Sequence, residues 1–271
     1  MADTLTRDER LRVVNGVAQD AVSMFAKGPL VVITSRSGNG APDSLGSGTL
    51  VRSRTGCAVL TCAHVIEGGG GLPLKVGHPA GSVLGHALGP ARCHPGRVDI
   101  AIAPILEPAP LLSFALSLDQ IAVPGEFPLS ENHPLLVVGY PEQLSRQIRL
   151  VRDERTDAGV MRRGFAHVAH LTSLAGQDRK ALSIHWDKVE ISAETAASHP
   201  LGITAGISDL RKPDGLSGGA VWWFGSFESD HLLWSPLRAG RLVAVPHKFT
   251  GRRQQAVPAF IWRSWLEEQL L

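Results

Sequence analysis

Cysteine is scarce in this sequence and does not form an even set. Among 271 residues only Cys57, Cys62 and Cys93 occur, whereas secreted proteins usually carry paired cysteines in a disulfide framework. We therefore expect three free thiols. The first residues, MADTLTRDERLRVV, are charged and polar, where a secretory signal needs about 7 to 15 apolar residues. These absences predict a cytoplasmic protein.

Long apolar runs and blocks of like charge are missing too. No run approaches the about 18 apolar residues of a membrane-spanning helix, and 27 Lys and Arg nearly balance 25 Asp and Glu. Basic residues are scattered in pairs such as Arg162-Arg163, so neither a membrane nor a nucleic-acid partner is expected. The arginine-rich stretch from Glu142 to Pro200 is expected to be a solvated loop, with docking of a regulatory protein as the alternative.

What the sequence does contain is a series of short β-rich runs separated by Gly, Ser, Asn and Pro clusters. Long helical segments do not alternate with these runs, so a parallel βαβ sheet is not expected. The runs are 30–34, 49–51, 58–61, 100–102, 135–138, 181–184, 220–223 and 241–245.

Helices are predicted only near the two ends of the chain. Thr6 and Glu9 have the spacing of a capping box at the start of a helix over 6–26. Pro258 suits the first turn of a C-terminal helix whose apolar residues recur every three or four positions. A proline-rich stretch over 104–124 indicates a boundary near residue 120, with one domain over 1–120 and a second over 121–271.

Three short segments carry residues suited to catalysis. Thr61-Cys62-Ala63-His64-Val65 places a histidine directly after a strand. Asp99 heads an apolar run, where a buried carboxylate is costly unless a donor such as a histidine Nδ1–H bonds to it. Gly215-Leu216-Ser217-Gly218-Gly219 surrounds a serine with glycines, which leaves room for a substrate carbonyl and for main-chain N–H donors. Each segment alone has an ordinary explanation as a turn or a chance histidine, but the order His, Asp, Ser indicates an activated serine.

These segments resemble, in type and order, the motifs of the chymotrypsin-like serine peptidases, in particular the bacterial intracellular type. The resemblance implies an all-β fold of two antiparallel six-stranded β-barrels, with the site in the cleft between them. The first barrel would supply His64 and Asp99, and the second would supply Ser217. The matching segments are Gly46-Ser47-Gly48-Thr49-Leu50-Val51, Thr61-Cys62-Ala63-His64, Asp99-Ile100-Ala101, Val138-Gly139-Tyr140-Pro141 and Gly215-Leu216-Ser217-Gly218-Gly219.

The same resemblance implies a serine endopeptidase that hydrolyses polypeptides through an acyl-enzyme intermediate. Ser217 Oγ would attack the scissile carbonyl, His64 would take and return its proton, and Asp99 would hold the imidazole in the required tautomer. The backbone N–H groups of Gly215 and Ser217 would form the oxyanion hole. No metal or cofactor is expected.

Two features of the sequence differ from the digestive members of this family. Leu216 stands where those members carry an aspartate that receives the ammonium freed by zymogen cleavage, so that mode of activation is not expected. Arg211 stands where trypsin-like members carry the pocket carboxylate, and His247 follows a strand that aligns with the pocket wall. These two residues predict a preference for an acidic or polar P1 side chain over Lys or Arg. The alternative is that both face solvent and the pocket is apolar.

Two other functions fit parts of the sequence. An α/β-hydrolase esterase would use the segment around Ser217 as its G-x-S-x-G nucleophile elbow, but its acid and histidine would have to follow within too few residues. A peptidase fold that has lost turnover would act as a binding scaffold and usually shows a substituted triad position, which is not seen here. Labelling by a fluorophosphonate probe separates the enzyme from the scaffold.

Overall fold

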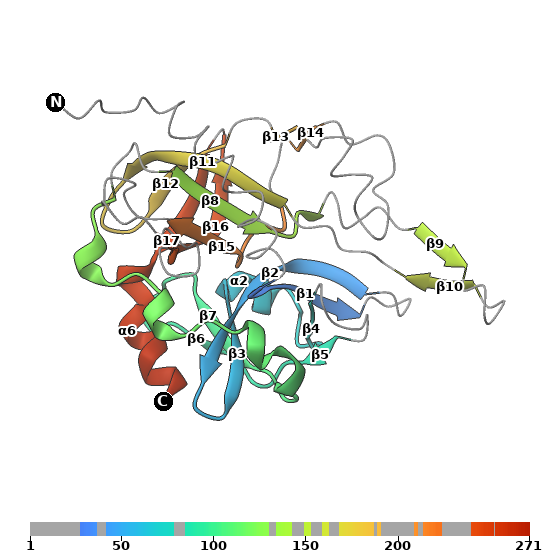
Figure 1. The fold of residues 1–271 in the computed structure, drawn as a ribbon. Coiled ribbons are helices and arrows are strands. Elements are labelled where there is room, and N and C mark those ends of the chain that lie inside the picture. The colour runs from blue at the N-terminus through green and yellow to red at the C-terminus, as the bar shows by residue number, and fades with distance from the viewer. Residues whose placement is uncertain are drawn as a thin grey trace, which may run out of the picture.

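The computed structural model is built mostly from β-strands (Figure 1). The predicted N-terminal helix over 6–26 and the predicted pocket residue Arg211 lie outside the described residues. In the part of the chain that is described, no helix combines the length and the apolar character needed to cross a membrane. The described residues are 28–36, 42–78, 85–129, 134–142, 149–152, 159–162, 168–186, 189–190, 209–210, 214–223, 240–251 and 253–271.

The N-terminal half forms an antiparallel seven-stranded sheet in the order β5-β4-β1-β2-β3-β7-β6. Its centre is the meander of β1, β2 and β3, whose residues Val31, Leu50 and Leu60 are fully buried. The strands are β1 (Leu30–Arg36), β2 (Pro42–Ser53), β3 (Gly56–Thr61), β4 (Lys75–Gly77), β5 (His86–Ala87), β6 (Arg92–Cys93) and β7 (Ala101–Pro104).

The C-terminal half forms a closed six-stranded barrel in the order β11-β12-β17-β16-β15-β8. All of its strand pairings are antiparallel, and Trp222 of β15 is fully buried. Its strands are β8 (Pro134–Gly139), β11 (Val168–Gln177), β12 (Leu182–His185), β15 (Ala220–Trp223), β16 (Arg241–Thr250) and β17 (Arg253–Pro258). Two separate hairpins are formed by β9 (Arg149–Arg152) with β10 (Gly159–Arg162) and by β13 (Val189–Glu190) with β14 (Asp209–Leu210).

The expectation of two six-stranded barrels therefore holds for the C-terminal half, while the first sheet differs from it. The first sheet has seven strands, and its two edge strands, β5 and β6, pair only with β4 and β7 in the described part of the chain. Each edge strand is two residues long, so neither offers the other a ladder long enough to close the sheet. The predicted strands at 30–34, 58–61, 135–138 and 220–223 all lie within observed strands.

The connection between the halves is bonded to both of them. It contains the 3₁₀ turns η1 (Ala109–Phe114), η2 (Leu118–Gln120) and η3 (Pro124–Glu126). The Leu116 N–H donates to the Leu50 carbonyl of the first sheet, and the Ala122 N–H donates to the Leu242 carbonyl of the barrel. The chain therefore passes from one sheet to the other between these two residues, and the predicted domain boundary at residue 120 stays a prediction.

The predicted C-terminal helix is present as α6 (Ala259–Leu270), which directly follows the last barrel strand. Trp262 of α6 is fully buried and donates its indole N–H to the Val257 carbonyl at 3.1 Å. At its far end, the Leu270 carbonyl accepts a hydrogen bond of 2.9 Å from the Arg54 N–H in the β2–β3 turn. The helix thus ties the barrel to the first sheet.

Candidate active site

His64 is placed by the end of β3 and the short helix that follows it. Thr61, the last residue of β3, is buried and donates its hydroxyl to the Ser47 carbonyl at 2.7 Å. The helix α2 (Ala63–Glu67) begins two residues later and holds His64 in its first turn. The imidazole is 48% exposed. A buried strand end therefore presents a solvent-accessible histidine at a fixed position.

Asp99 approaches His64 from the loop that precedes β7. Arg97, two residues earlier, has a φ of +56° and is the one non-glycine residue with positive φ in the described ranges. This turn directs the Asp99 carboxylate to His64, where Oδ2 lies 2.6 Å from His64 Nδ1 and Oδ1 accepts the His64 backbone N–H at 3.1 Å. The two contacts fix both the position of the histidine and the direction of its ring.

The pair shifts the pKa values of both residues in the directions that an ion pair requires. The hydrogen bond to Asp99 raises the pKa of His64 against the opposing effect of burial, and the charges of Asp99 and Glu67 add to the increase. Burial alone would raise the pKa of Asp99, but contacts with His247 and His64 lower it well below its usual value. Asp99 is therefore ionised at neutral pH and favours a protonated His64.

Ser217 lies in a tight turn just before β15, and two glycines make that turn possible. Gly215 has a φ of +91° and Gly218 a φ of +83°, a backbone region that side chains rarely tolerate. A Cβ on Gly218 would also overlap the Ser47 carbonyl oxygen and the Thr61 hydroxyl. The glycines around the serine are thus needed for the turn itself and for its close approach to the first sheet.

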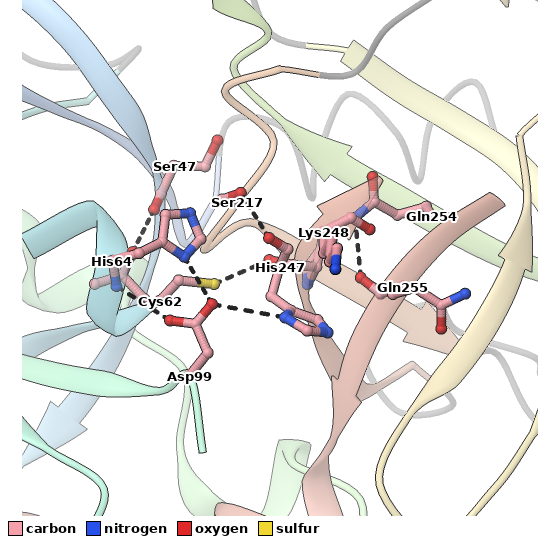
Figure 2. Close-up of polar contacts among 11 residues, drawn as sticks. Ser47, Cys62, His64, Asp99, Ser217, His247, Lys248, Gln254 and Gln255 are labelled. Carbon is pink, nitrogen blue, oxygen red and sulfur yellow. Dashed lines mark hydrogen bonds and ion pairs between the residues drawn. The ribbon is translucent and has the colours of Figure 1, made fainter. Parts of the chain in front are cut away.

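Several contacts place the Ser217 turn against the segment that carries His64. The Ser217 carbonyl accepts the Ser47 N–H at 2.8 Å. A Cβ built on Gly46 would lie 3.0 Å from the Ser217 carbonyl oxygen and 2.8 Å from Val65, the neighbour of His64. Figure 2 shows the His64 ring with one nitrogen turned to Asp99 and the rest of the ring on the side where Ser217 lies.

The Ser217 hydroxyl is not yet bonded to the histidine. Ser217 Oγ donates to the His247 carbonyl at 3.2 Å, and no hydrogen bond joins Ser217 to His64 in the described structure. A catalytic role would require the hydroxyl to turn from this carbonyl toward the His64 ring. Such loose alignment is common in catalytic sites without substrate.

The predicted oxyanion donors are both available. Within the described residues, neither the Gly215 N–H nor the Ser217 N–H donates a hydrogen bond to the protein. The neighbouring donors are used, since the Gly218 N–H bonds to the Pro246 carbonyl at 2.9 Å and the Gly219 N–H bonds to the Leu216 carbonyl at 2.9 Å. The turn therefore leaves the N–H groups of Gly215 and Ser217 without a partner in the part of the protein that the structure describes.

Leu216 anchors this turn by burial. It is fully buried in the core, and a Cβ on Gly139 would lie 2.7 Å from Leu216 Cδ2. A buried leucine thus stands at the position where digestive peptidases carry the aspartate that pairs with a freed ammonium group. The turn needs no charged partner to keep its position, because burying a leucine contributes about 1.5 to 3 kcal/mol.

Sequence reasoning missed the part played by Ser47. Its hydroxyl donates to the Gly215 carbonyl at 2.8 Å and accepts the Tyr140 N–H at 2.8 Å. One side chain of the first sheet therefore holds both the Ser217 turn and the end of β8. The signal was present in the motif Gly46-Ser47-Gly48, where glycines leave a serine close to other backbone.

His247, predicted to line a substrate pocket, lies beside the Asp99 carboxylate. Its Nδ1 is 3.6 Å from Asp99 Oδ2, and its side chain is 24% exposed. A role in binding an acidic P1 side chain stays a prediction, and the structure adds a contact with the candidate catalytic pair. Arg211 lies outside the described residues.

All three cysteines are free, as predicted, and one of them lies at the site. Cys62 Sγ is buried and 3.1 Å from the Pro246 carbonyl, to which the thiol donates. Burial, followed by the charge of Asp99, raises the pKa of Cys62 well above its usual value, against a backbone hydrogen bond from Gly218. Potential ligand atoms of Cys62, His64 and Asp99 lie within 4.8 Å of one another, but hydrogen bonds within the protein already account for this grouping.

The esterase alternative does not fit the fold. An α/β-hydrolase needs a mainly parallel sheet, whereas every pairing between strands in the described structure is antiparallel. Comparisons with known proteins add no assignment, since no protein-family model matches the chain and a search of curated proteins finds no match.

Proposed function

We propose that this chain is a serine endopeptidase of the chymotrypsin-like kind, with His64, Asp99 and Ser217 as its catalytic triad. The observation that carries the proposal is the 2.6 Å contact between His64 Nδ1 and Asp99 Oδ2, made beside a serine whose glycine turn leaves two main-chain donors free. In this proposal the seven-stranded sheet takes the place of the first barrel of the family and the closed barrel is the second.

The arrangement supports a stepwise acyl transfer. Ser217 Oγ turns from the His247 carbonyl to His64 Nε2 and attacks the scissile carbonyl while its proton passes to Nε2. Asp99 stabilises the imidazolium that forms, and the N–H groups of Gly215 and Ser217 bind the oxyanion. The proton then goes to the leaving amine, and the carbonyl carbon stays bonded to Ser217 Oγ. Water, activated by the same histidine, releases the acid and restores the serine.

Polypeptide is the proposed substrate, and the proposed compartment is the cytoplasm. Free thiols are typical of a reducing compartment, and Cys57, Cys62 and Cys93 are all unpaired. A regulatory protein partner remains part of the proposal for the arginine-rich stretch over 142–200. The mechanism uses no metal or cofactor, so EDTA should leave turnover unchanged.

One observation favours a second candidate, a binding scaffold with this fold. Ser217 Oγ donates to the His247 carbonyl at 3.2 Å, which would hold the hydroxyl away from its base if it persisted with substrate bound. The two candidates differ in the reactivity of Ser217, because only a serine activated by its base reacts rapidly with a fluorophosphonate.

The test is fluorophosphonate labelling followed by mass mapping of the modified residue. We expect one label, on Ser217, and its loss in Ser217→Ala and His64→Ala. The matched control is Ser113→Ala, which removes an exposed serine on η1 and should be labelled like the wild type. An unlabelled wild-type protein, or labelling that survives Ser217→Ala, would refute the proposed enzyme.

A further inference from the structure

His247 occupies a β-bulge in β16. The pairing of β16 with β17 runs in register to Pro246, which faces Ala256, and resumes at Lys248, which faces Gln255. His247 is therefore the extra residue between two consecutive partners. Bulges of this kind redirect a side chain and are frequent next to active sites. Here the redirected side chain is an imidazole.

The bulge is held in place from both sides by the candidate active site. The Pro246 carbonyl accepts the Cys62 thiol at 3.1 Å and the Gly218 N–H at 2.9 Å. The next carbonyl, that of His247, accepts Ser217 Oγ at 3.2 Å. Residues next to His64 and Ser217 thus fix the backbone from which the His247 side chain projects.

From this backbone the His247 ring reaches Asp99 on the side away from His64 (Figure 2). The distance of 3.6 Å between Nδ1 and Asp99 Oδ2 is longer than a hydrogen bond, yet the contact with His247 contributes to the lowered pKa of Asp99. Oδ2 therefore lies between an imidazole of the first sheet and an imidazole of the barrel. The ionisable side chains around His247 in Figure 2 are Asp99, His64, Cys62 and Lys248.

We propose that His247 is a positioning residue of the triad, which restrains the Asp99 carboxylate from the barrel side and thereby fixes the orientation of His64. The inference rests on the proposed function. The Asp99 side chain is 28% exposed, and both of its hydrogen bonds described above come from His64. Neither bond restrains the carboxylate from the barrel side. The His247 ring, 3.6 Å from Oδ2 and contributed by the other half of the molecule, supplies that restraint as an electrostatic contact. The bulge places the ring there.

The experiment compares two substitutions of nearly equal size. His247→Asn keeps an N–H donor close to the position of Nδ1, and His247→Leu removes it. We expect His247→Leu to lower kcat about 10-fold with KM nearly unchanged, and His247→Asn to retain most of the activity. His86→Leu, in the edge strand β5 far along the chain from these residues, is the control for losing a histidine as such. Thermal unfolding of each variant establishes that it is folded.

An NMR titration of the His64 ring supplies a readout that does not depend on peptidase activity. In His247→Leu the carboxylate loses its restraint from the barrel side and bonds less steadily to His64 Nδ1, the contact that raises the pKa of His64. The His64 midpoint should therefore move to lower pH. It should stay near the wild-type value in His247→Asn and His86→Leu. If His247 served only the stability of the fold, His247→Leu would lower the unfolding temperature and leave the His64 midpoint unchanged.

The outcomes separate the two proposals. An unchanged His64 midpoint in His247→Leu, or an equal effect of Leu and Asn, overturns the positioning role even if the chain is a peptidase. If the His64 midpoint shifts but the wild-type protein is not labelled by the fluorophosphonate, the positioning of Asp99 by His247 stands. The proposed peptidase function is then overturned instead.

Discussion

In the proposed triad each residue has a separate role, and these roles determine how much activity each substitution should remove. Ser217→Ala removes the nucleophile and His64→Ala removes the base. Because triad residues act as one unit, the loss of either one removes most of the rate enhancement that they produce together. We expect either change to lower kcat by about 10⁴- to 10⁶-fold and Asp99→Asn by about 10⁴-fold. Steady-state kinetics on a cleaved peptide measures these losses, with Ser113→Ala as the control. Substantial activity in Ser217→Ala would show that the nucleophile lies elsewhere.

In the proposed mechanism, the pKa of His64 sets the pH dependence of the reaction. Because the hydrogen bond to Asp99 raises this pKa, the acid limb of kcat/KM should have its midpoint above about 6.5, the value of an unperturbed histidine. Below the midpoint the imidazole is protonated and cannot accept the Ser217 proton, so activity rises with pH. Asp99→Asn should move the midpoint down. A wild-type midpoint below about 6.5 would contradict the pairing.

Specificity at P1 is the third property argued from single residues. Arg211 in the predicted pocket would repel a basic P1 side chain, and a charge-assisted hydrogen bond to an acidic one contributes about 1.5 to 3 kcal/mol, or roughly 10- to 150-fold. We expect kcat/KM to be higher for Glu than for Arg at P1 in otherwise identical peptides, with a Leu peptide as the neutral reference. A clear preference for Arg would refute the predicted pocket.

At the scale of elements, the turn before β15 is held close to the first sheet by its glycines. Gly218 has a positive φ, and a Cβ there would overlap the backbone of Ser47 and the hydroxyl of Thr61. Gly218→Ala should therefore displace the turn, destabilise the fold by about 1 to 3 kcal/mol and lower kcat/KM by at least about 100-fold.

Gly125→Ala is the matched control for this change. Gly125 lies in η3, and a Cβ there would meet no atom within 4 Å. Chemical denaturation and kinetics on both variants test the prediction. Equal behaviour of Gly218→Ala and Gly125→Ala would mean that the turn tolerates a side chain.

For the whole molecule, α6 links the barrel to the first sheet, and Trp262 is its buried anchor. Trp262→Ala should destabilise the protein by about 3 to 5 kcal/mol, because it leaves a large cavity and removes the hydrogen bond to Val257. Leu271→Ala, at the exposed C-terminal residue, should change stability by less than about 0.5 kcal/mol. Denaturant unfolding compares them, and an unaffected midpoint in Trp262→Ala would contradict the anchoring role.

How much was predictable follows from how far apart the interacting residues are in the sequence. The β-rich runs, the C-terminal helix and the glycine turn around Ser217 depend on local propensity. Their own residues were therefore enough to predict them. The open edge of the first sheet could not be predicted in this way. Closure of a sheet depends on whether two edge strands, far apart in the sequence, are long enough to pair. Ser47 shows the same limit, since its partners Gly215 and Tyr140 are 168 and 93 residues away.

The sequence by itself determined which residues carry reactive groups and which glycines make room for them, because these properties belong to residue types and their neighbours. Only the tertiary structure decided that Leu216 is a buried anchor, and that a bulge in β16 turns His247 to Asp99. Both outcomes depend on which strands meet, since one extra residue in a ladder changes where the next side chain points. The approach of the barrel to the first sheet is what joins these residues.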